Sequence, residues 1–378
     1  MSTLISLCMF NFFSTKNLAI DLGNNNTLLS DQSTILLSQP SFMIVNESNN
    51  KVEAVGDKAY EMLEKTHSNL KPVKPLKGGV ISDGESVKKM LKNLVSRIEK
   101  PSYFPSGYNY ILSGVPYDTT PVEKRALRDV LDQFSSKNTF LVHEPLAATL
   151  GLGLDIKEPE GKLVVDIGGG ITEVVIISLS GIAAFQWIRI GGDTFDEEIQ
   201  DYFRRVYNLS IGLKTAERIK KEIGCVYSPV SLETEFAYVK GKDLMEGIPT
   251  NRAIAQRELT KVLERPFKQI EECIQQSLEI CPPELSSDIY RSGIYVTGGN
   301  AQLKGIRERL QKTFQLPVHI DSEPLLAVSK GIAKILAAPQ KYRSVLISGS
   351  RSENFTSDHS VHAIVRQQQQ SLPYSQSA

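Results

Sequence analysis

The sequence has few cysteines and no net charge. These two features argue against zinc binding and against nucleic-acid binding, respectively. Its 378 residues include four cysteines, none of them in a C-x-x-C pair. This pattern argues against a zinc knuckle and favours free thiols in a reducing compartment. The 43 basic and 43 acidic side chains give a formal net charge of +0. The chain therefore lacks the positive field of a nucleic-acid-binding protein, and we expect no nucleic-acid partner.

The N-terminus lacks an apolar segment long enough to cross a membrane. Residues 1–13 are rich in apolar side chains, but a spanning helix needs roughly 20 such residues. They also lack the basic region and small-residue cleavage site of a signal peptide. We expect residues 1–16 to lie on a membrane surface, the alternative being that they pack against the body or a partner subunit. The loop pair Tyr103–Phe104 either tucks inward or inserts into the same surface.

Chain length and composition indicate more than one domain. A chain of 378 residues with 41% hydrophobic content exceeds the size at which a single core stops growing, so two or more domains are expected. Beyond residue 339 the composition becomes polar, with a run of glutamines at 367–370. We expect residues 339–378 to form a disordered polar tail.

A glycine-rich turn between two apolar runs is the central motif. The run from Lys162 ends at Asp166, passes through Gly168–Gly170 and resumes as a second β-branched run to Ser178. This pattern predicts a strand, a tight turn and a returning strand. Glycines let backbone N–H groups approach a phosphate closely, and an aspartate at the turn suits Mg²⁺ that keeps most of its waters. A plain hairpin is the alternative.

A second copy of this motif lies near the N-terminus. There a short apolar run ends in Asp21-Leu22-Gly23 and is followed by Asn24–Asn26 and another apolar run. Two such hairpins in one chain are much less expected by chance than one. They predict two related lobes that face a single nucleotide across a cleft.

A third candidate feature is Glu144, which stands directly before a proline-initiated, alanine-rich helix. A carboxylate at a helix start is often a partner of the helix dipole. The functional alternative is a carboxylate that orients or deprotonates a water in line with a γ-phosphate.

Together these motifs resemble the actin/Hsp70/sugar-kinase superfamily, and within it most closely the MreB family of bacterial actins. The resemblance runs from about Leu18 to Ala338 with the order and spacing of the motifs kept. It is carried by Asp21–Gly23, Glu144–Ala148, Asp166–Gly170, Arg189–Asp193, Thr215–Gly224, Cys281–Leu285 with Ser287–Ile289, and Val296–Gly299.

The resemblance implies an α/β, two-lobed actin-like ATPase fold, each lobe a mixed sheet flanked by helices with a small inserted subdomain. Lobe I would span residues 17–156, completed by 319–338, with its small subdomain at about 35–75. Lobe II would span residues 157–318, with its small subdomain at about 182–255.

The resemblance also implies ATP and Mg²⁺ as cofactors, with a role for each matching position. Asp21 and Asp166 would face the Mg²⁺, and Glu144 and Thr172 would act in hydrolysis. The residues expected to contact the nucleotide are Gly23, Asn24, Asn25, Asn26, Gly168, Gly169, Gly170, Ile171, Thr172, Gly192, Glu217, Lys220, Gly298, Gly299 and Asn300.

Within this set, Glu217 and Lys220 would border the ribose and adenine. Their i, i+3 spacing places both on one helix face, although a solvated ion pair is the alternative. Gly298, Gly299 and Asn300 would let the backbone approach the purine from the other side.

The sequence departs from the family pattern at four places. Ile171 replaces a threonine whose hydroxyl is thought to help hold the attacking water. Asn24 and Asn25 replace a Thr-Ala pair, Asn300 replaces a third glycine, and His143 stands where a second acid usually precedes the glutamate. We therefore expect nucleotide binding, whereas a weak ATPase activity is left open.

The expected function is that of an ATP-dependent, membrane-associated, actin-like filament protein that organises cell-wall synthesis and maintains cell shape. Its partners would be other copies of the chain in head-to-tail filaments, which could pair, the inner membrane surface and the cell-wall elongation machinery. It would be cytoplasmic and peripheral to the inner face of the cell membrane. The alternative is a nucleotide-binding, polymerising scaffold with little or no ATP hydrolysis.

Overall fold

The computed structural model describes most of the chain. The predicted membrane segment (1–16), the Tyr103–Phe104 loop and the tail from residue 348 onward lie outside the described residues, which are 17–65, 69–98, 108–232 and 234–347.

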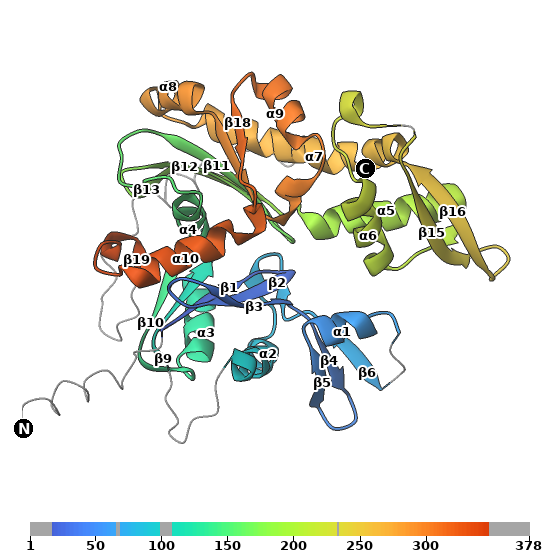
Figure 1. The fold of residues 1–378 in the computed structure, drawn as a ribbon, viewed down its shortest axis with the longest axis horizontal. Helices are drawn as coiled ribbons and strands as arrows, with labels where there is room; N and C mark the ends of the chain where they lie inside the picture. Colours follow the sequence, from blue (N-terminus) through green and yellow to red (C-terminus); the bar gives the residue numbers. More distant parts are fainter. Residues whose placement is uncertain (1–16, 66–68, 99–107, 233, 348–378) are drawn as a thin grey trace, which may run out of the picture. The chain divides into compact units, whose positions relative to one another are not determined.

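Two large mixed sheets with the same strand order form the framework (Figure 1). The sheet of lobe I runs in the order β3 (Ile35–Pro40), β2 (Asn26–Ser30), β1 (Asn17–Leu22), β9 (Tyr108–Val115), β10 (Ser135–His143) and β19 (Leu346–Ile347). The sheet of lobe II runs in the order β13 (Gly181–Ile188), β12 (Thr172–Ser178), β11 (Lys162–Ile167), β17 (Ile294–Thr297) and β18 (Val318–Ile320).

In both sheets an antiparallel hairpin leads into strands that run parallel. β1 pairs antiparallel with β2 and parallel with β9, and β11 pairs antiparallel with β12 and parallel with β17. The duplicated plan confirms the prediction of two related lobes, and it places the two glycine-rich turns at equivalent positions in the two sheets.

The outer face of each sheet is covered by helices. Helices α2 (Gly84–Ile98) and α3 (Pro121–Leu131) share a core with Leu18 and Ile20 of β1. α3 begins at a capping box, in which the Thr120 side chain accepts the backbone N–H of Glu123 and the Glu123 carboxylate reaches back. Helices of lobe II share a core with alternate residues of β11; they are α5 (Gly192–Tyr207), α6 (Leu213–Ile223), α7 (Gln256–Glu279), α8 (Pro283–Ser292) and α9 (Ile306–Phe314).

Two helices lie between the sheets and belong to the cores of both. Buried side chains of α4 (Glu144–Gly151) and α10 (Ala327–Ala337) pack with Ala19 of β1 on one side and Val164 of β11 on the other. Because successive strand residues point to opposite faces, Ala19 and Val164 face this inner layer while their neighbours face the outer cores.

Each lobe also carries a small sheet. In lobe I the strands are β5 (Lys51–Val55), β4 (Met43–Asn46) and β6 (Leu70–Val73), with helix α1 (Asp57–Met62) beside them and a short hairpin of β7 (Leu76–Lys77) and β8 (Val80–Ile81) after them. In lobe II the strands are β14 (Leu209–Ser210), β15 (Phe236–Asp243) and β16 (Pro249–Ala255). Short 3₁₀ turns complete the fold at η1 (Ser228–Val230), η2 (Gly299–Gln302), η3 (Pro324–Leu326) and η4 (Arg343–Val345).

The small subdomains begin later than the expected boundaries of about 35 and 182. Strands β3 and β13 lie inside those expected subdomains, yet each extends a large sheet by pairing with β2 or β12. Both strands continue an antiparallel meander, and their hydrogen bonds to the preceding strand make them part of the large sheets.

Two C-terminal boundaries also differ from the expectation. β18 pairs with β17 of lobe II, so the part of 319–338 that packs in lobe I is α10. Residues 339–347, expected to begin the disordered tail, form η4 and β19. β19 pairs antiparallel with β10, and Tyr342 and Val345 are buried. Because the composition of this stretch is polar, the sequence did not indicate that Tyr342 and Val345 would be buried.

Among the described helices, none combines the length and apolar character that crossing a membrane requires.

We predict that Gly331→Ala destabilises the protein by about 1–3 kcal/mol or more, because α4 and α10 touch backbone to backbone. A Cβ on Gly331 would lie 1.7 Å from the Ala147 carbonyl oxygen, and one on Gly151 would lie 1.8 Å from that of Ala327. The measurement is urea unfolding. Gly84→Ala is the control, since a Cβ there meets nothing within 4 Å. An unchanged midpoint for Gly331→Ala would contradict the close contact.

Candidate functional site

The two glycine-rich turns have the same geometry. The first glycine of each turn donates its N–H to the carbonyl three residues on, at 3.0 Å from Gly23 to Asn26 and 2.9 Å from Gly168 to Ile171. Each glycine follows its aspartate by two residues. The strand–turn–strand pattern predicted from the sequence is therefore present twice, with one carboxylate at the same place in each copy.

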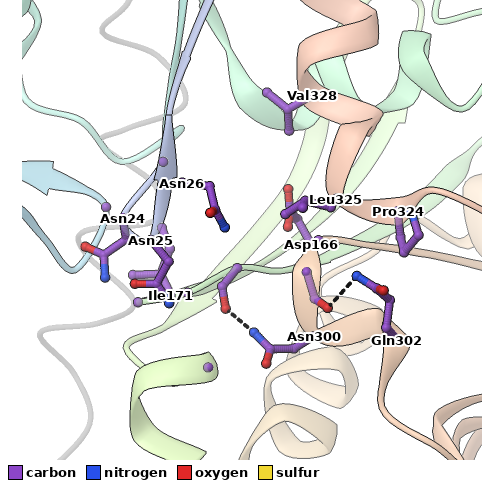
Figure 2. A pocket seen from close by; sticks show the side chains of 18 of the residues that line it. Asn24, Asn25, Asn26, Asp166, Ile171, Asn300, Gln302, Pro324, Leu325 and Val328 are labelled. Carbon is purple, nitrogen blue, oxygen red and sulfur yellow. Dashed lines mark hydrogen bonds between the residues drawn. The ribbon is translucent and has the colours of Figure 1, made fainter. Parts of the chain in front are cut away.

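A cavity of about 460 Å³ lies between the two turns (Figure 2). Its volume is in the range of small-molecule sites. Residues predicted from the sequence that line it are Asp21, Gly23, Asn24, Asn25, Asn26, Glu144, Asp166, Gly168, Gly169, Gly170, Ile171, Gly192, Glu217, Lys220, Gly298, Gly299 and Asn300. Further lining residues that the sequence did not single out include Lys221, Gly224, Gln302, Leu303, Pro324, Leu325 and Val328.

The tips of the two hairpins approach each other closely. A Cβ on Gly169 would lie 2.6 Å from the Asn25 amide, and a Cβ on Gly170 would lie 2.8 Å from Asn24 Nδ2. Only glycine fits at this approach without displacing an asparagine of the opposite lobe.

Buried carboxylates give the hairpin end of the cavity its electrostatic character. Burial, with a smaller contribution from the charge of Asp166, raises the pKa of Asp21 to about 7, and burial raises the pKa of Asp166 to about 6. Burial also raises the pKa of Glu144 well above its usual value, with the charge of Glu173 adding to the shift. Among the described residues, no lysine or arginine offsets the effect of burial on these three carboxyl groups.

This arrangement fits a hard divalent cation. Mg²⁺ prefers oxygen ligands and is commonly held by one or two carboxylates together with phosphates and water. Asp21 and Asp166 supply such a pair, and a bound cation would remove the cost of ionising them. Among the described residues no group of three or more His, Cys, Asp or Glu side chains is arranged to hold a metal by itself.

Glu173 also belongs to this acidic group, although the motifs of the sequence did not indicate a role for it. Its side chain is 3% exposed, and its Oε1 accepts the backbone N–H of Tyr117 at 2.8 Å. Burial raises its pKa to about 8, against the opposing effect of the Tyr117 hydrogen bond. Its position directly opposite Asp166 in the β11–β12 ladder is the signal that could have found it.

Thr172 is the predicted residue that the structure keeps away from the cavity. It is fully buried, and its hydroxyl donates to the Ile190 carbonyl at 2.7 Å. Ile171 lines the cavity instead. Because side chains alternate along the strand, the threonine next to Ile171 points to the other face, which contradicts its predicted role at the phosphates and in hydrolysis.

Lys220 lies at the cavity but its ammonium group is already bound. Nζ is 2.9 Å from Asp196 Oδ1 and donates to the Gly192 carbonyl at 2.8 Å. The pair is buried, with the Lys220 side chain 6% exposed. Lys220 therefore fixes the start of α5 beside the hairpin, and Asp196 is a partner that sequence spacing did not reveal.

Asn300 braces the second hairpin. Its Nδ2 donates to the Gly168 carbonyl at 2.6 Å, as Figure 2 shows. Gly298 has a φ of +87°, and a Cβ there would lie 2.4 Å from Asp166 Oδ1. The Nδ2 group of Asn300 is thus bound to the turn.

Asp193 links the two lobes beside the hairpin tips. Its N–H donates to the Gly169 carbonyl at 2.8 Å within lobe II. Its Oδ2 accepts Asn24 Nδ2 at 2.7 Å and Lys74 Nζ at 2.6 Å, both from lobe I. Asp193 therefore links the two hairpins, through its backbone on one side and its carboxylate on the other.

Comparison with known proteins gives consistent matches. The profile of the MreB/Mbl protein family matches residues 15–344. The chain is 39% identical over 327 residues to the cell shape-determining protein MreB of Escherichia coli K12, covering 85% of this chain and 93% of that protein. It is 34% identical over 322 residues to the cell shape-determining protein Mbl of Bacillus subtilis, covering 85% and 96%.

Solved structures show the same fold. The crystal structure of MreB5 of Spiroplasma citri bound to AMPPNP matches with a TM-score of 0.82 and 33% identity, over 88% of this chain and 99% of that chain. The same protein bound to ADP also matches with a TM-score of 0.82. A MamK double helical filament matches with a TM-score of 0.70 at 21% identity, which shows likeness of fold.

We predict that Glu173→Gln stabilises the ligand-free protein increasingly as pH rises. An unfolded glutamate loses its proton at about pH 4.3, whereas Glu173 in the folded protein holds its proton up to about pH 8. Between these values the folded state binds the extra proton, so this group's contribution to stability is lost as pH rises. The variant should gain several kcal/mol, up to about 5, at about pH 8 and almost nothing at about pH 4.5.

Urea unfolding across this pH range measures the difference. Glu197→Gln, at an exposed position of α5, is the matched control and should follow the parent protein. A gain for Glu173→Gln that stays constant with pH would show that burial does not suppress ionisation of this carboxyl.

Proposed function

The chain belongs to the MreB/Mbl family, and on this premise we propose that it is an ATP-dependent, membrane-associated, actin-like filament protein that organises cell-wall synthesis and maintains cell shape. The observation that carries the proposal is the pair of equivalent hairpins, one from each lobe, that face each other across one cavity. A ligand between them contacts both lobes at once.

Nucleotide binding is the best-supported part of the proposal. Backbone N–H groups at the two turns and the amides of Asn24 and Asn25 are donors suited to phosphate oxygens. The start of α5 lies beside them and adds the favourable end of a helix dipole. The solved MreB5 structures carry AMPPNP and ADP, and we assign the same class of ligand to this cavity.

Asp21 and Asp166 are the residues that would hold Mg²⁺. Such an ion would supply positive charge that offsets the charge of the phosphates. The two carboxylates keep their positions because one sits on β1 and the other on β11, at the ends of central strands.

Glu144 is the residue that would orient the attacking water. It begins α4 and lines the cavity. Burial raises its pKa, and a cation bound nearby would favour the ionised form that can accept a proton. Ile171 supplies no hydroxyl to help hold that water, so the expected ATPase is slow. A polymerising scaffold with little or no hydrolysis is the second candidate, and Ile171 is the observation that favours it.

Filament formation follows from the same geometry. A nucleotide that contacts both hairpins fixes the orientation of the lobes. A fixed orientation favours one head-to-tail contact between copies, which is a heterologous interface and generates an open filament. Pairing of filaments, attachment through residues 1–16 and the Tyr103–Phe104 loop to the inner face of the cell membrane, and contact with the cell-wall elongation machinery complete the proposal.

We predict that the purified protein sediments with Mg-ATP and releases phosphate, and that Glu144→Gln lowers the release rate by at least about tenfold without preventing sedimentation. Ultracentrifugation and phosphate release, with Mg-ATP, Mg-GTP and no nucleotide, provide the measurement. Glu85→Ala, an exposed acid in the first turn of α2, is the control.

The outcomes separate the two candidates. Sedimentation without phosphate release favours the scaffold. The absence of sedimentation under every condition, with lipid included, would overturn the filament proposal.

We also predict that deletion of residues 1–13 abolishes co-sedimentation with anionic liposomes, because these residues supply the apolar surface for an interfacial segment. Polymerisation without lipid should persist in the deleted protein and serves as the control for its folding. Unchanged liposome binding would rule out the N-terminal segment as the anchor.

A further inference from the structure

Helix α1 of lobe I meets helix α6 of lobe II, which lines part of the cavity. The Tyr60 hydroxyl donates to Glu217 Oε2. Glu64 Oε1 accepts the Leu213 N–H at 2.6 Å. Lys214 Nζ donates to the Tyr60 carbonyl at 3.3 Å and lies 4.9 Å from the centroid of its ring. Four side chains therefore tie the two lobes together here.

Glu217 is held from two sides. Oε2 accepts Tyr60 from lobe I, and Oε1 accepts Lys221 Nζ from its own helix at 2.6 Å. Burial raises the pKa of Glu217, but the hydrogen bonds from Lys221 and Tyr60 outweigh burial and keep that pKa below its usual value. The group is thus an ionised acceptor, and a carboxylate has about four acceptor sites, so unused sites remain.

The part of the cavity lined by α6 suits a ligand that donates hydrogen bonds. Among the described lining residues, the acidic ones are Asp21, Glu144, Asp166 and, on α6, Glu217. The lysines that line the cavity are already paired: Lys220 with Asp196, Lys221 with Glu217 and Lys304 with Glu235. The exposed acceptor capacity of Glu217 therefore suits the hydroxyl groups of a sugar.

We propose that Tyr60 is a specificity-determining residue for the ribose of the nucleotide, acting from the opposite lobe by orienting the Glu217 carboxylate toward a ribose hydroxyl. The inference rests on the proposed function, since it requires a nucleotide in the cavity. Tyr60 itself does not line the cavity; it fixes the rotamer of the carboxylate that does. Selection for the sugar then depends on contact between α1 and α6.

The test is equilibrium binding of Mg-ATP, Mg-2′-deoxy-ATP and Mg-3′-deoxy-ATP to the full chain. The parent protein is expected to prefer ATP over at least one deoxy analogue. Tyr60→Phe removes the hydroxyl but keeps the ring against Lys214, and it is expected to reduce that preference roughly fivefold. Binding of the disfavoured analogue should change little, because the lost interaction is with the missing hydroxyl.

Tyr202→Phe is the matched control. The Tyr202 hydroxyl also donates to a glutamate, Glu258, within lobe II and away from the cavity. This variant should lose some thermal stability and keep the parent's preference among the three nucleotides. Glu217→Gln provides a second variant of the site and should reduce the same preference.

Three results would overturn the proposal. They are an unchanged preference in Tyr60→Phe, an equal loss of affinity for all three nucleotides, and a parent protein that binds all three equally well. A parent protein that binds no nucleotide would instead refute the proposed function on which the inference rests, so the two failures are distinguishable.

Discussion

The close contact between α4 and α10 is the constraint on which the rest of the structure depends. Each helix places a small residue and a glycine four positions apart against the other, so their backbones touch and the pair fits between two sheets. Because α4 begins at Glu144 and both sheets pack on this layer, the same contact sets the position of the glutamate relative to Asp21 and Asp166. Packing in the interior therefore fixes the geometry of the cavity.

Unlike this packing, the buried charges of the cavity cost free energy in the ligand-free protein. Several carboxyl groups are buried near the hairpins, and among the described residues no cationic side chain offsets their burial, which is costly when they ionise. Other charges that line the cavity are matched in pairs, such as Lys220 with Asp196. A cation and phosphates therefore suit the unbalanced carboxyl groups, and neutral hydrogen-bond donors suit the part lined by α6.

The local features could be predicted from the sequence, and the long-range ones could not. The turns at Gly23 and Gly168 are determined by residues within a few positions, and they have the predicted form. Tyr60 and Glu217 are 157 positions apart, and nothing in either segment indicates the other. The assignment of Thr172 to the cavity failed for a related reason, since the motif identifies a pair of neighbours but the strand's pleat decides which of them faces inward.

Two sets of contacts join the lobes beside the cavity. Asp193 joins Asn24 and Lys74, and Tyr60 joins Glu217. Separation of the lobes would break both sets, so these contacts oppose breathing of the lobes, a motion that commonly limits the release of a bound ligand. In a polymer, neighbouring subunits that restrain this breathing would slow the exchange of contents, so each subunit would retain its ligand longer inside the assembly than outside it.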